Sequence, residues 1–343
     1  MRKYLKLIIL FFVAIFIIWF FGRNLDWNQV KSSLQKANIS YIAVATLIIC
    51  CGYMLRAIRW KVLLSPITET SLRELFATTT VGFAAVFFVG RMGEIVRPMW
   101  LPMRDKRVRP SAALVTLFLE RIFDLTALAS FFAINLLWFE SPKGREAEFE
   151  WIRLVGYLLL IGVVFGIISL AIFQSYSPKI IVWLEKKAFL KNKLGLIFLS
   201  IFRQLGNALA ILRDWKQLFK VIFWTIALWL AISVPTWLVL QAFNLPLDFS
   251  DSLFIMGFAA VSSVVPTPGG AAGAFHTATA GSLILLNVDQ DTAAATSIIM
   301  HLVYFAPAIF FGFYYFMRGD IGIESLKSLF SVEHTTEEIE SEK

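Results

Sequence analysis

The chain has 343 residues, of which 58% are hydrophobic and 16% are charged, and its formal net charge is +8. A soluble domain carries about 25% charged residues, so this composition excludes a globular protein that hides its apolar side chains in one core. The basic residues lie beside apolar segments and form no reading surface, so no nucleic-acid partner is expected. The sequence therefore predicts an all-α, polytopic membrane protein.

Six apolar segments are long enough to form spanning helices, each of which needs roughly 20 residues. The first, "MRKYLKLIILFFVAIFIIWFF", starts with basic residues and is followed by no small-residue cleavage site, so it is interpreted as a retained helix. A basic, partly amphipathic piece, residues 179–216, is expected to join the fourth span to the fifth. The predicted spans are 1–21, 41–60, 111–139, 152–174, 217–241 and 297–317.

Two further apolar regions are too short or too broken to cross a bilayer. Residues 75–89 stop at Gly90, and residues 252–286 are interrupted by "SSVVPTPGGAAGAF". Both are predicted to be re-entrant helical hairpins. A pair of spanning helices is the alternative for 252–286, because it would leave the later loops on the same sides.

The distribution of Lys and Arg predicts the orientation, because cytoplasmic loops are enriched in both residues. The basic groups share one side only if 75–89 enters and leaves by the cytoplasmic face. We therefore expect both termini in the cytoplasm, a location in the cytoplasmic (inner) membrane, and hairpins that enter from opposite faces, a pattern typical of an inverted repeat. The basic residues are Arg2, Lys3, Lys6, Arg56, Arg59, Lys61, Arg104, Lys106, Arg107, Arg109, Lys179, Lys186, Lys187, Lys191 and Lys193.

The domain organisation predicted from these segments is simple. Residues 1–320 are expected to form a single integral membrane domain. Residues 321–343 end in "EHTTEEIESEK" and are expected to be an acidic, disordered cytoplasmic tail.

Three charges interrupt the third predicted span, in "LFLERIFDLTAL". Glu120 and Asp124 lie one turn apart on one helix face, and Arg121 is within i,i+3 reach of Asp124. A charge at a helix centre costs about 2.5–3.5 kcal/mol on insertion scales, so these groups must meet partners or water. The two interpretations are an ion pair that only fixes helix packing and the polar lining of a cavity. Arg91 and Arg97 are the expected partners.

A second charged group follows the short hairpin, in "GRMGEIVRP". On one helix, Arg91, Glu94 and Arg97 would fall within about a third of the circumference, so that both arginines flank Glu94. Because arginine presents a fork suited to phosphate or carboxylate, the group is a candidate anion site. The alternative is interfacial anchoring by snorkelling arginines.

The stretch "VVPTPGGAAGAFH" combines residues that break a helix. Pro266 and Pro268 lack backbone donors, and Gly269 and Gly270 permit left-handed turns. Broken backbone inside a membrane is tolerated only where protein or water satisfies it. This stretch, with His276 at its end, is therefore a candidate cavity lining, and a loop at the membrane surface is the alternative.

No catalytic or cofactor motif accompanies these residues. The sequence has no phosphate-binding glycine loop before a lysine, no nucleophile elbow, no zinc-binding His-Glu-x-x-His helix and no Asp-rich metal motif. His276 and His301 have no Cys or carboxylate at ligand spacing, so no metal site is predicted. The adjacent Cys50 and Cys51 are interpreted as packing residues. We expect neither an enzyme nor a cofactor.

Four motifs appear in an order that resembles a known family. "RAIRWKVLL", "GRMGEIVRP", "ERIFDL" and "PTPGGAAGAFH" together resemble the lysylphosphatidylglycerol synthase transmembrane-region family of flippase-like membrane proteins, over about residues 5–320. The resemblance implies a helical membrane domain with re-entrant segments that moves a lipid. The soluble aminoacylating domain of two-domain members is missing here, so synthase activity is not implied.

The resemblance also assigns roles to positions in this chain. It implies that six charged residues line a lipid headgroup path. The chain departs from the family pattern at His276, where the family often has Glu. The six are Arg91, Glu94, Arg97, Glu120, Arg121 and Asp124.

The function expected from residues and resemblance is a lipid translocase. Its partners would be membrane lipids, either a phospholipid or a polyprenyl- or glycan-linked lipid. One alternative is a non-catalytic membrane partner of a lipid-modifying enzyme or glycosyltransferase, and another is a membrane-embedded lipid-modifying enzyme.

Overall fold

The structure, a computed structural model, describes residues 23, 25–185, 214–262 and 269–318, and all regular structure in these ranges is helical. Short connections join the helices, as is usual for helical bundles. The elements are α2 (Trp27–Lys36), α3 (Ile39–Leu64), α4 (Leu72–Val89), the 3₁₀ helix η1 (Gly90–Ile95), α5 (Val96–Arg104), α6 (Pro110–Trp138), α7 (Glu146–Glu185), α9 (Trp215–Ala242), α10 (Phe249–Ser262), α11 (Ala272–Leu285) and α12 (Gln290–Arg318).

Four described helices are long and apolar enough to cross a membrane: α3, residues 146–169 of α7, α9 and α12. They contain the predicted spans 41–60, 217–241 and 297–317 and most of 152–174, so these four spans are confirmed. The protein is therefore a multi-pass α-helical membrane protein. The start of the predicted connector, residues 179–216, belongs to α7, which continues as one helix to Glu185. Residues 186–213 of it lie outside the described residues.

Two predicted spans, 111–139 and 1–21, are not among these four helices. The segment 111–139 forms α6, which has 29 residues and is about 43 Å long at 1.5 Å per residue. That length exceeds the roughly 30 Å hydrocarbon core, and the charges in its middle find partners inside the protein. The predicted first span, 1–21, and the predicted tail, 321–343, lie outside the described residues.

Local sequence explains where several of these helices begin and end. Ser71 caps α4 by accepting a hydrogen bond from the Glu74 amide at 3.2 Å, as expected for a Ser-x-x-Glu capping box. Asp214 caps α9 through the amides two and three residues later. Pro110 occupies the first turn of α6, where its missing amide costs no hydrogen bond. Gly90 ends α4 with a φ of +66°, a conformation that favours glycine.

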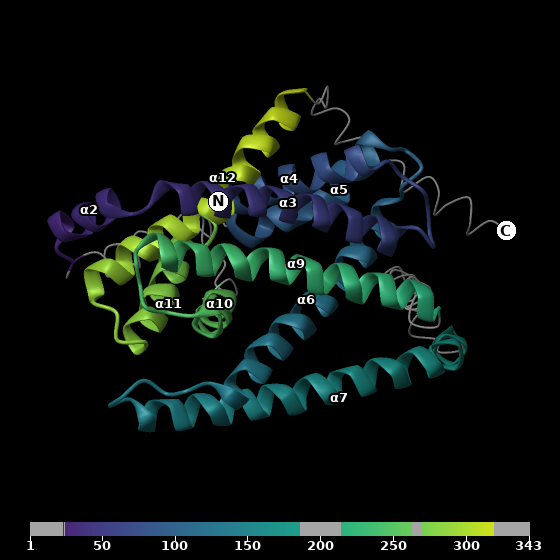
Figure 1. The fold of residues 1–343 in the computed structure, drawn as a ribbon. Coiled ribbons are helices and arrows are strands. Elements are labelled where there is room, and N and C mark those ends of the chain that lie inside the picture. The colour runs from purple at the N-terminus through teal and green to yellow at the C-terminus, as the bar shows by residue number, and fades with distance from the viewer. Residues whose placement is uncertain (1–22, 24, 186–213, 263–268, 319–343) are drawn as a thin grey trace, which may run out of the picture.

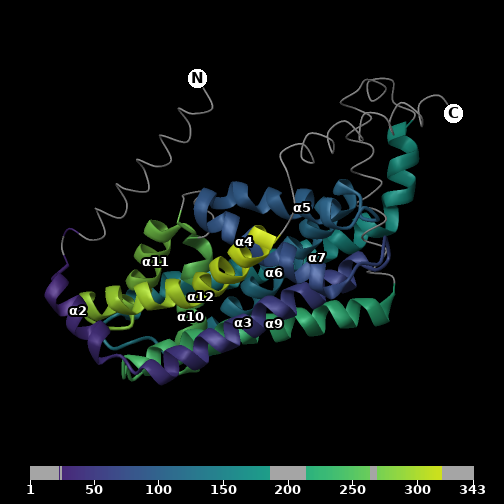
Figure 2. The ribbon, with the colours of Figure 1, turned by 90° about the horizontal axis from the view of Figure 1, so that it is seen from above.

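The centre of the bundle is the antiparallel pair α3 and α9, which lie side by side along their length (Figures 1 and 2). Near one end of the pair, the Asn38 amide donates to the Ala242 carbonyl at 2.8 Å. Helix α6 crosses from this bundle to α7, which lies at the edge of the molecule (Figure 1). Most large side chains of α7 are exposed and face the lipid once the protein is in a bilayer.

The first hairpin consists of α4, η1 and α5, and it folds back on itself at Gly90. Gly93 in η1 packs so closely on the backbone of Ala85 and Val86 that a Cβ atom at this position would collide with it. The hairpin is held against the end of α3 near Leu64 by a cluster of buried side chains. This cluster contains Ala57, Trp60, Leu64, Leu75, Leu101, Val108, Ala113 and Leu117.

The second hairpin consists of α10 and α11, which pack on one another. Each has 14 residues and is about 21 Å long, too short to cross the hydrocarbon core. Phe254 of α10 and Leu283 of α11 share a buried cluster with Ile49 of α3 and Leu240 of α9. The second hairpin therefore packs towards the other end of the α3–α9 pair from the first, and the short length of its helices favours a hairpin over two spanning helices. Entry of the two hairpins from opposite membrane faces stays a prediction.

Candidate functional site

Buried charged side chains gather where α3, the first hairpin and α6 meet. We call this group the arginine cluster. It joins two carboxylates of α6 to guanidinium groups from three helices, and four of its six members are at most 5% exposed. The arginine cluster consists of Arg56 and Arg59 of α3, Arg97 of α5, and Glu120, Arg121 and Asp124 of α6.

Glu120 is the most heavily paired member. Arg97 donates to its two carboxylate oxygens at 2.8 and 3.1 Å, a bidentate arrangement that arginine alone can provide. Arg121 donates at 2.8 Å, and the Nη2 atom of Arg59 lies 3.7 Å from Oε1. Because Glu120 has no exposed surface, these arginines replace the water that the carboxylate would otherwise require.

Asp124 lies one turn further along α6 and completes the cluster. Arg59 donates to its Oδ1 at 2.6 Å, and Arg121 approaches its Oδ2 at 3.2 Å, the i,i+3 contact expected from the sequence. The Nη1 atom of Arg56 is 4.0 Å from the same oxygen. Arg59 also donates to the Thr225 hydroxyl of α9 at 3.3 Å, so the cluster contacts a fourth helix.

Aromatic rings hold the arginines in place. The guanidinium carbon of Arg97 lies 4.3 Å from the centroid of the Trp60 ring, and Trp60 donates to the Thr116 hydroxyl at 3.0 Å. Arg56 lies 4.7 Å from the centroid of Phe83. The side chain of Arg97 runs directly over Gly82, where a Cβ atom would collide with it. Glycine at this position therefore lets Arg97 reach Glu120.

A small hollow opens on the cluster between the first hairpin and α6. Glu94, Arg97 and Arg121 line it together with Phe83, and it has room for about one water molecule. The side chain of Arg121 is 36% exposed, and that of Arg56 is 14% exposed. Four guanidinium groups face the paired carboxylates of Glu120 and Asp124, and the Glu94 carboxylate lies near Arg121 at the hollow. Four positive charges against three negative ones leave a surplus of one positive charge, and part of Arg121 is accessible.

The predicted partners of the buried acids are confirmed in part. Arg97 pairs with Glu120 as expected, whereas nothing is described for the side chain of Arg91. The expectation that the charged triplet follows one helix was wrong, because residues 91 and 94 lie in η1 and residue 97 lies in α5. The tight turn at Gly90 and Gly93 changes the number of residues per helical turn between Arg91 and Arg97. The guanidinium group of Arg97 is already bound to Glu120.

Two members of the cluster were missed by the sequence reasoning. Arg56 and Arg59 were placed at the cytoplasmic exit of the second span, but they lie inside α3, and Arg59 has no exposed surface. The available signal was two arginines three residues apart on a helix, directly before a tryptophan. This spacing places both on the same face.

The tips of the two hairpins form a second polar contact. The amides of Gly269 and Gly270 both donate to the Phe87 carbonyl in the last turn of α4, at 2.6 and 3.0 Å. Positive φ angles of +74° and +62° aim these amides at the first hairpin. Pro266 and Pro268 lie outside the described residues. Among the described residues, no three His, Cys, Asp or Glu side chains group as a metal site.

His276, the last residue of the candidate lining, lies on α11 close to these tips. Its Nδ1 atom is 3.3 Å from the Ser297 hydroxyl of α12. Its ring is also 4.9 Å from that of His301, measured between centroids. The sequence reasoning did not anticipate that these two histidines meet.

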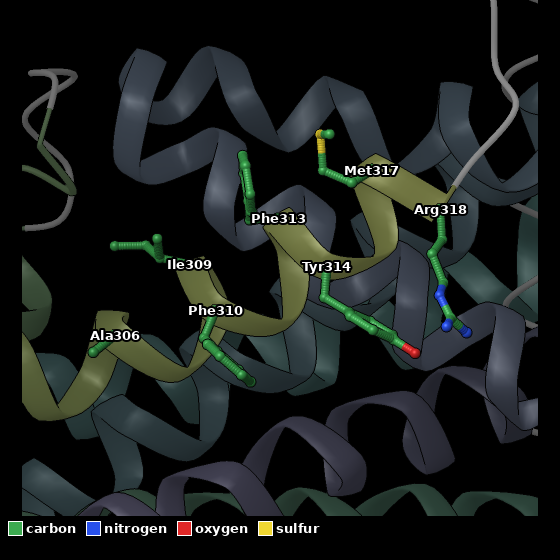
Figure 3. A pocket seen from close by; sticks show the side chains of 7 residues that line it. All are labelled: Ala306, Ile309, Phe310, Phe313, Tyr314, Met317 and Arg318. Atoms are coloured by element: carbon green, nitrogen blue, oxygen red, sulfur yellow. The ribbon is translucent and has the colours of Figure 1, made fainter.

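A larger hollow, of about 630 Å³, lies along the outer surface of α12 (Figure 3). Apart from Arg318, the side chains that line it are uncharged, and all of them come from this one helix (Figure 3). Phe310, Phe313 and Met317 in it are more than half exposed. Such a surface suits acyl chains rather than a headgroup. Its lining consists of Ala306, Ile309, Phe310, Phe313, Tyr314, Met317 and Arg318.

Comparisons with known proteins agree with this architecture. The family described as "Lysylphosphatidylglycerol synthase TM region" matches residues 5–312. The UPF0104 membrane protein PH1989 of Pyrococcus horikoshii is 20% identical over 318 residues, which cover 88% of this chain and 91% of that protein. With the match extending over nearly the whole chain, the protein belongs to the lysylphosphatidylglycerol synthase transmembrane-region family.

Proposed function

We propose that the protein is a lipid translocase of the cytoplasmic membrane that moves a phosphate-bearing lipid, with both of its termini in the cytoplasm. The lipid would be a phospholipid or a polyprenyl phosphate that carries a glycan. Its headgroup would pass along the arginine cluster while its acyl chains stay in the surrounding bilayer. The protein would neither hydrolyse ATP nor modify the lipid chemically.

One observation carries this proposal: the surplus of guanidinium groups at a buried site between a re-entrant hairpin and α6. Both carboxylates of the cluster are already paired, so they offer little to a cationic headgroup. Arg121 retains an exposed edge, and the ionic contact of Arg56 with Asp124 is long, at 4.0 Å. A guanidinium group can bind a phosphate through two parallel hydrogen bonds. The chemistry of the site therefore favours an anionic headgroup.

The hollow at the arginine cluster is too small for a lipid headgroup, so part of the protein must move for one to pass. The hollow at Arg121 admits about one water molecule, whereas a glycerophosphate headgroup is several times larger. The side of the hollow that contains Glu94 belongs to the first hairpin, which returns to the membrane face from which it started. Passage of a headgroup would therefore require the first hairpin to separate from α6.

Lipid exchange in reconstituted vesicles tests the proposal. Fluorescent phosphatidylglycerol and a neutral fluorescent glucosylceramide of equal chain length would be followed from one leaflet to the other. We expect the protein to accelerate exchange of phosphatidylglycerol at least about tenfold more than that of the glycolipid, equivalent to about 1.4 kcal/mol. Equal acceleration of both would contradict the phosphate-binding role, and no acceleration of either would contradict the translocase.

The same preparation separates the alternatives. A chemically altered lipid recovered after incubation would favour an enzyme. Two results together would favour a non-catalytic membrane partner. The protein would exchange no lipid in vesicles, and it would still support its cellular role after alanine replaces Glu94 and Asp124. Unchanged lipids with selective exchange are the outcome that we expect.

A further inference from the structure

Two histidines lie side by side within the membrane domain, next to the point where the hairpin tips touch. His276 lies on α11 and His301 on α12, with ring centroids 4.9 Å apart. His301 is 6% exposed, and its Nε2 atom is buried without a hydrogen-bond partner. Buried polar atoms are nearly always hydrogen-bonded, so an unpaired imidazole nitrogen indicates a functional use.

Aromatic rings surround the unpaired imidazole. The centroid of the His301 ring lies 4.9 Å from Phe305, 5.1 Å from Phe275 and 6.0 Å from Phe87. These phenyl rings come from α12, α11 and α4. No carboxylate among the described residues pairs with His301. An imidazolium ion formed on this ring would therefore have no carboxylate counter-ion in the described part of the chain, and a buried charge without one is costly.

The other titratable groups near the histidines are tyrosines that already have partners. Tyr304 of α12 packs against Phe275, and its hydroxyl is hydrogen-bonded to Thr236 of α9. Tyr53 of α3 donates to the Tyr304 carbonyl at 2.9 Å. Neither tyrosine contacts the Nε2 atom of His301, and the groups that favour a charged ring here are backbone groups of the tip residues Gly269 and Gly270.

The His301 ring adjoins the contact between the hairpins. The Phe87 carbonyl accepts from both tip glycines, while the Phe87 ring contacts His301 and Phe305. Gly270 packs on the Phe305 ring so closely that a Cβ atom would collide with it. The same few residues thus enclose the imidazole and join the tips, so a charge on His301 acts directly on the tip contact.

We propose that His276 and His301 form a proton-binding site that couples lipid movement to a proton gradient, an inference that rests on the proposed translocase function. The Nε2 lone pair of His301 takes a proton from water and the ring becomes imidazolium; the proton later returns to water on the other side. Separation of the tips would expose the Phe87 carbonyl and admit water beside the contacts of the ring with Gly269 and Gly270. A proton on His301 therefore changes the balance between joined and separated tips.

Proton binding can be measured without transport. Histidine labelled with ¹⁵N would be titrated by NMR in lipid nanodiscs for the unaltered protein, His276→Gln and His334→Gln. The third histidine, His334, lies outside the described residues and serves as the matched control. We expect a His301 titration midpoint that moves when His276 is replaced and stays in place when His334 is replaced, because adjacent titrating rings influence one another. A midpoint that is the same in both variants overturns the inference.

Coupling is measured in proteoliposomes with and without an imposed pH gradient. We expect the gradient to accelerate phosphatidylglycerol exchange by the unaltered protein and by His334→Gln at least about tenfold. His301→Gln should keep the exchange seen without a gradient and lose the acceleration. If His301→Gln does not fold, the NMR titration of the unaltered protein against His276→Gln and His334→Gln decides the inference.

The outcomes separate the two proposals. Equal acceleration in His301→Gln and the unaltered protein overturns proton coupling and leaves the translocase standing. Absence of exchange by the unaltered protein under every condition contradicts the translocase, and with it the coupling. The NMR titration still reports independently whether the histidine pair binds a proton.

Discussion

Arginine, rather than lysine, is suited to each basic position of the cluster. Arg97 binds both oxygens of Glu120 while its guanidinium plane lies over Trp60, and lysine can do neither with one compact ammonium group. Arg121 contacts both Glu120 and Asp124. Because each arginine carries several donors in a fixed geometry, a small number of arginines neutralises two acids. Some donors remain unused, such as the Nε atoms of Arg59 and Arg97.

Neutralising Glu120 should be strongly destabilising. In Glu120→Gln the guanidinium groups of Arg97 and Arg121 lose a buried counter-ion, and breaking a buried ion pair costs about 3–5 kcal/mol. The free energy of unfolding in detergent, measured by denaturant titration, should fall by about that amount. Glu150→Gln on the exposed surface of α7 is the matched control and should change it by less than about 0.5 kcal/mol. Equal effects of the two variants would contradict the ion-pair network.

Asp105, between α5 and α6, should make this loop sensitive to acid. Hydrogen bonds from Arg107 and Thr70 hold the pKa of its carboxyl at about 2, below the ordinary 3.8. Because the pKa is lowered in the folded state, the stabilisation is present above about pH 4 and is lost as the pH falls towards 2. The protection factors of the loop amides, which correct for the intrinsic slowing of amide exchange in acid, should fall across that window. In Asp105→Asn the fall should be absent, and a variant that retains it would contradict this role.

Glycine positions, more than apolar content, determine how the two hairpins fold. The helices themselves follow from hydrophobic runs and capping residues, and their ranges were predicted well from the sequence. Loop charges correctly predicted that 75–89 turns back. The hydrogen bonds between the tips could not be predicted, because backbone amides such as those of Gly269 and Gly270 leave no pattern in side-chain chemistry.

Replacing Gly93 tests how closely the first hairpin packs. In Gly93→Val the added side chain meets the backbone of Ala85 and Val86, which cannot move away as a flexible side chain can. Overpacking of this kind costs about 1–3 kcal/mol or more, so the thermal unfolding temperature should fall by several degrees. Gly162→Val on α7 is the control, since nothing lies within 4 Å of that position. A similar temperature for both variants would argue against the hairpin.

At the scale of the whole molecule, the hairpins occupy opposite ends of the α3–α9 pair and meet at their tips. Loop charge predicted that the first hairpin turns back, because every later loop would change sides if residues 75–89 spanned the membrane. It left two spanning helices as an alternative for residues 252–286, and it did not predict the contact between the tips. It did not predict that Arg56 and Arg59 belong to the cluster. Basic residues near a span end usually anchor it at the interface, and only the packing of α6 against α3 reveals the acids that face them.

Orientation can be tested with single cysteines in a background that lacks Cys50 and Cys51. Lys106→Cys, between α5 and α6, should react with a membrane-impermeant thiol reagent only from the cytoplasmic side. Lys143→Cys, between α6 and α7, should react only from the other side, because α6 is expected to cross the membrane between them. Both residues are exposed, so access within the protein is not limiting. Labelling of both from the same side would contradict the topology.

The central claim is that the arginine cluster binds the lipid phosphate. The rate of phosphatidylglycerol exchange in vesicles that contain Arg121→Gln tests this claim most directly. Arg145→Gln, which removes an arginine from an outer ion pair with Glu148, is the matched control. Losing one charge-assisted contact should slow exchange at least about tenfold in Arg121→Gln, equivalent to about 1.4 kcal/mol, and leave Arg145→Gln unchanged. Folded Arg121→Gln protein that exchanges phosphatidylglycerol as fast as the control would contradict the claim.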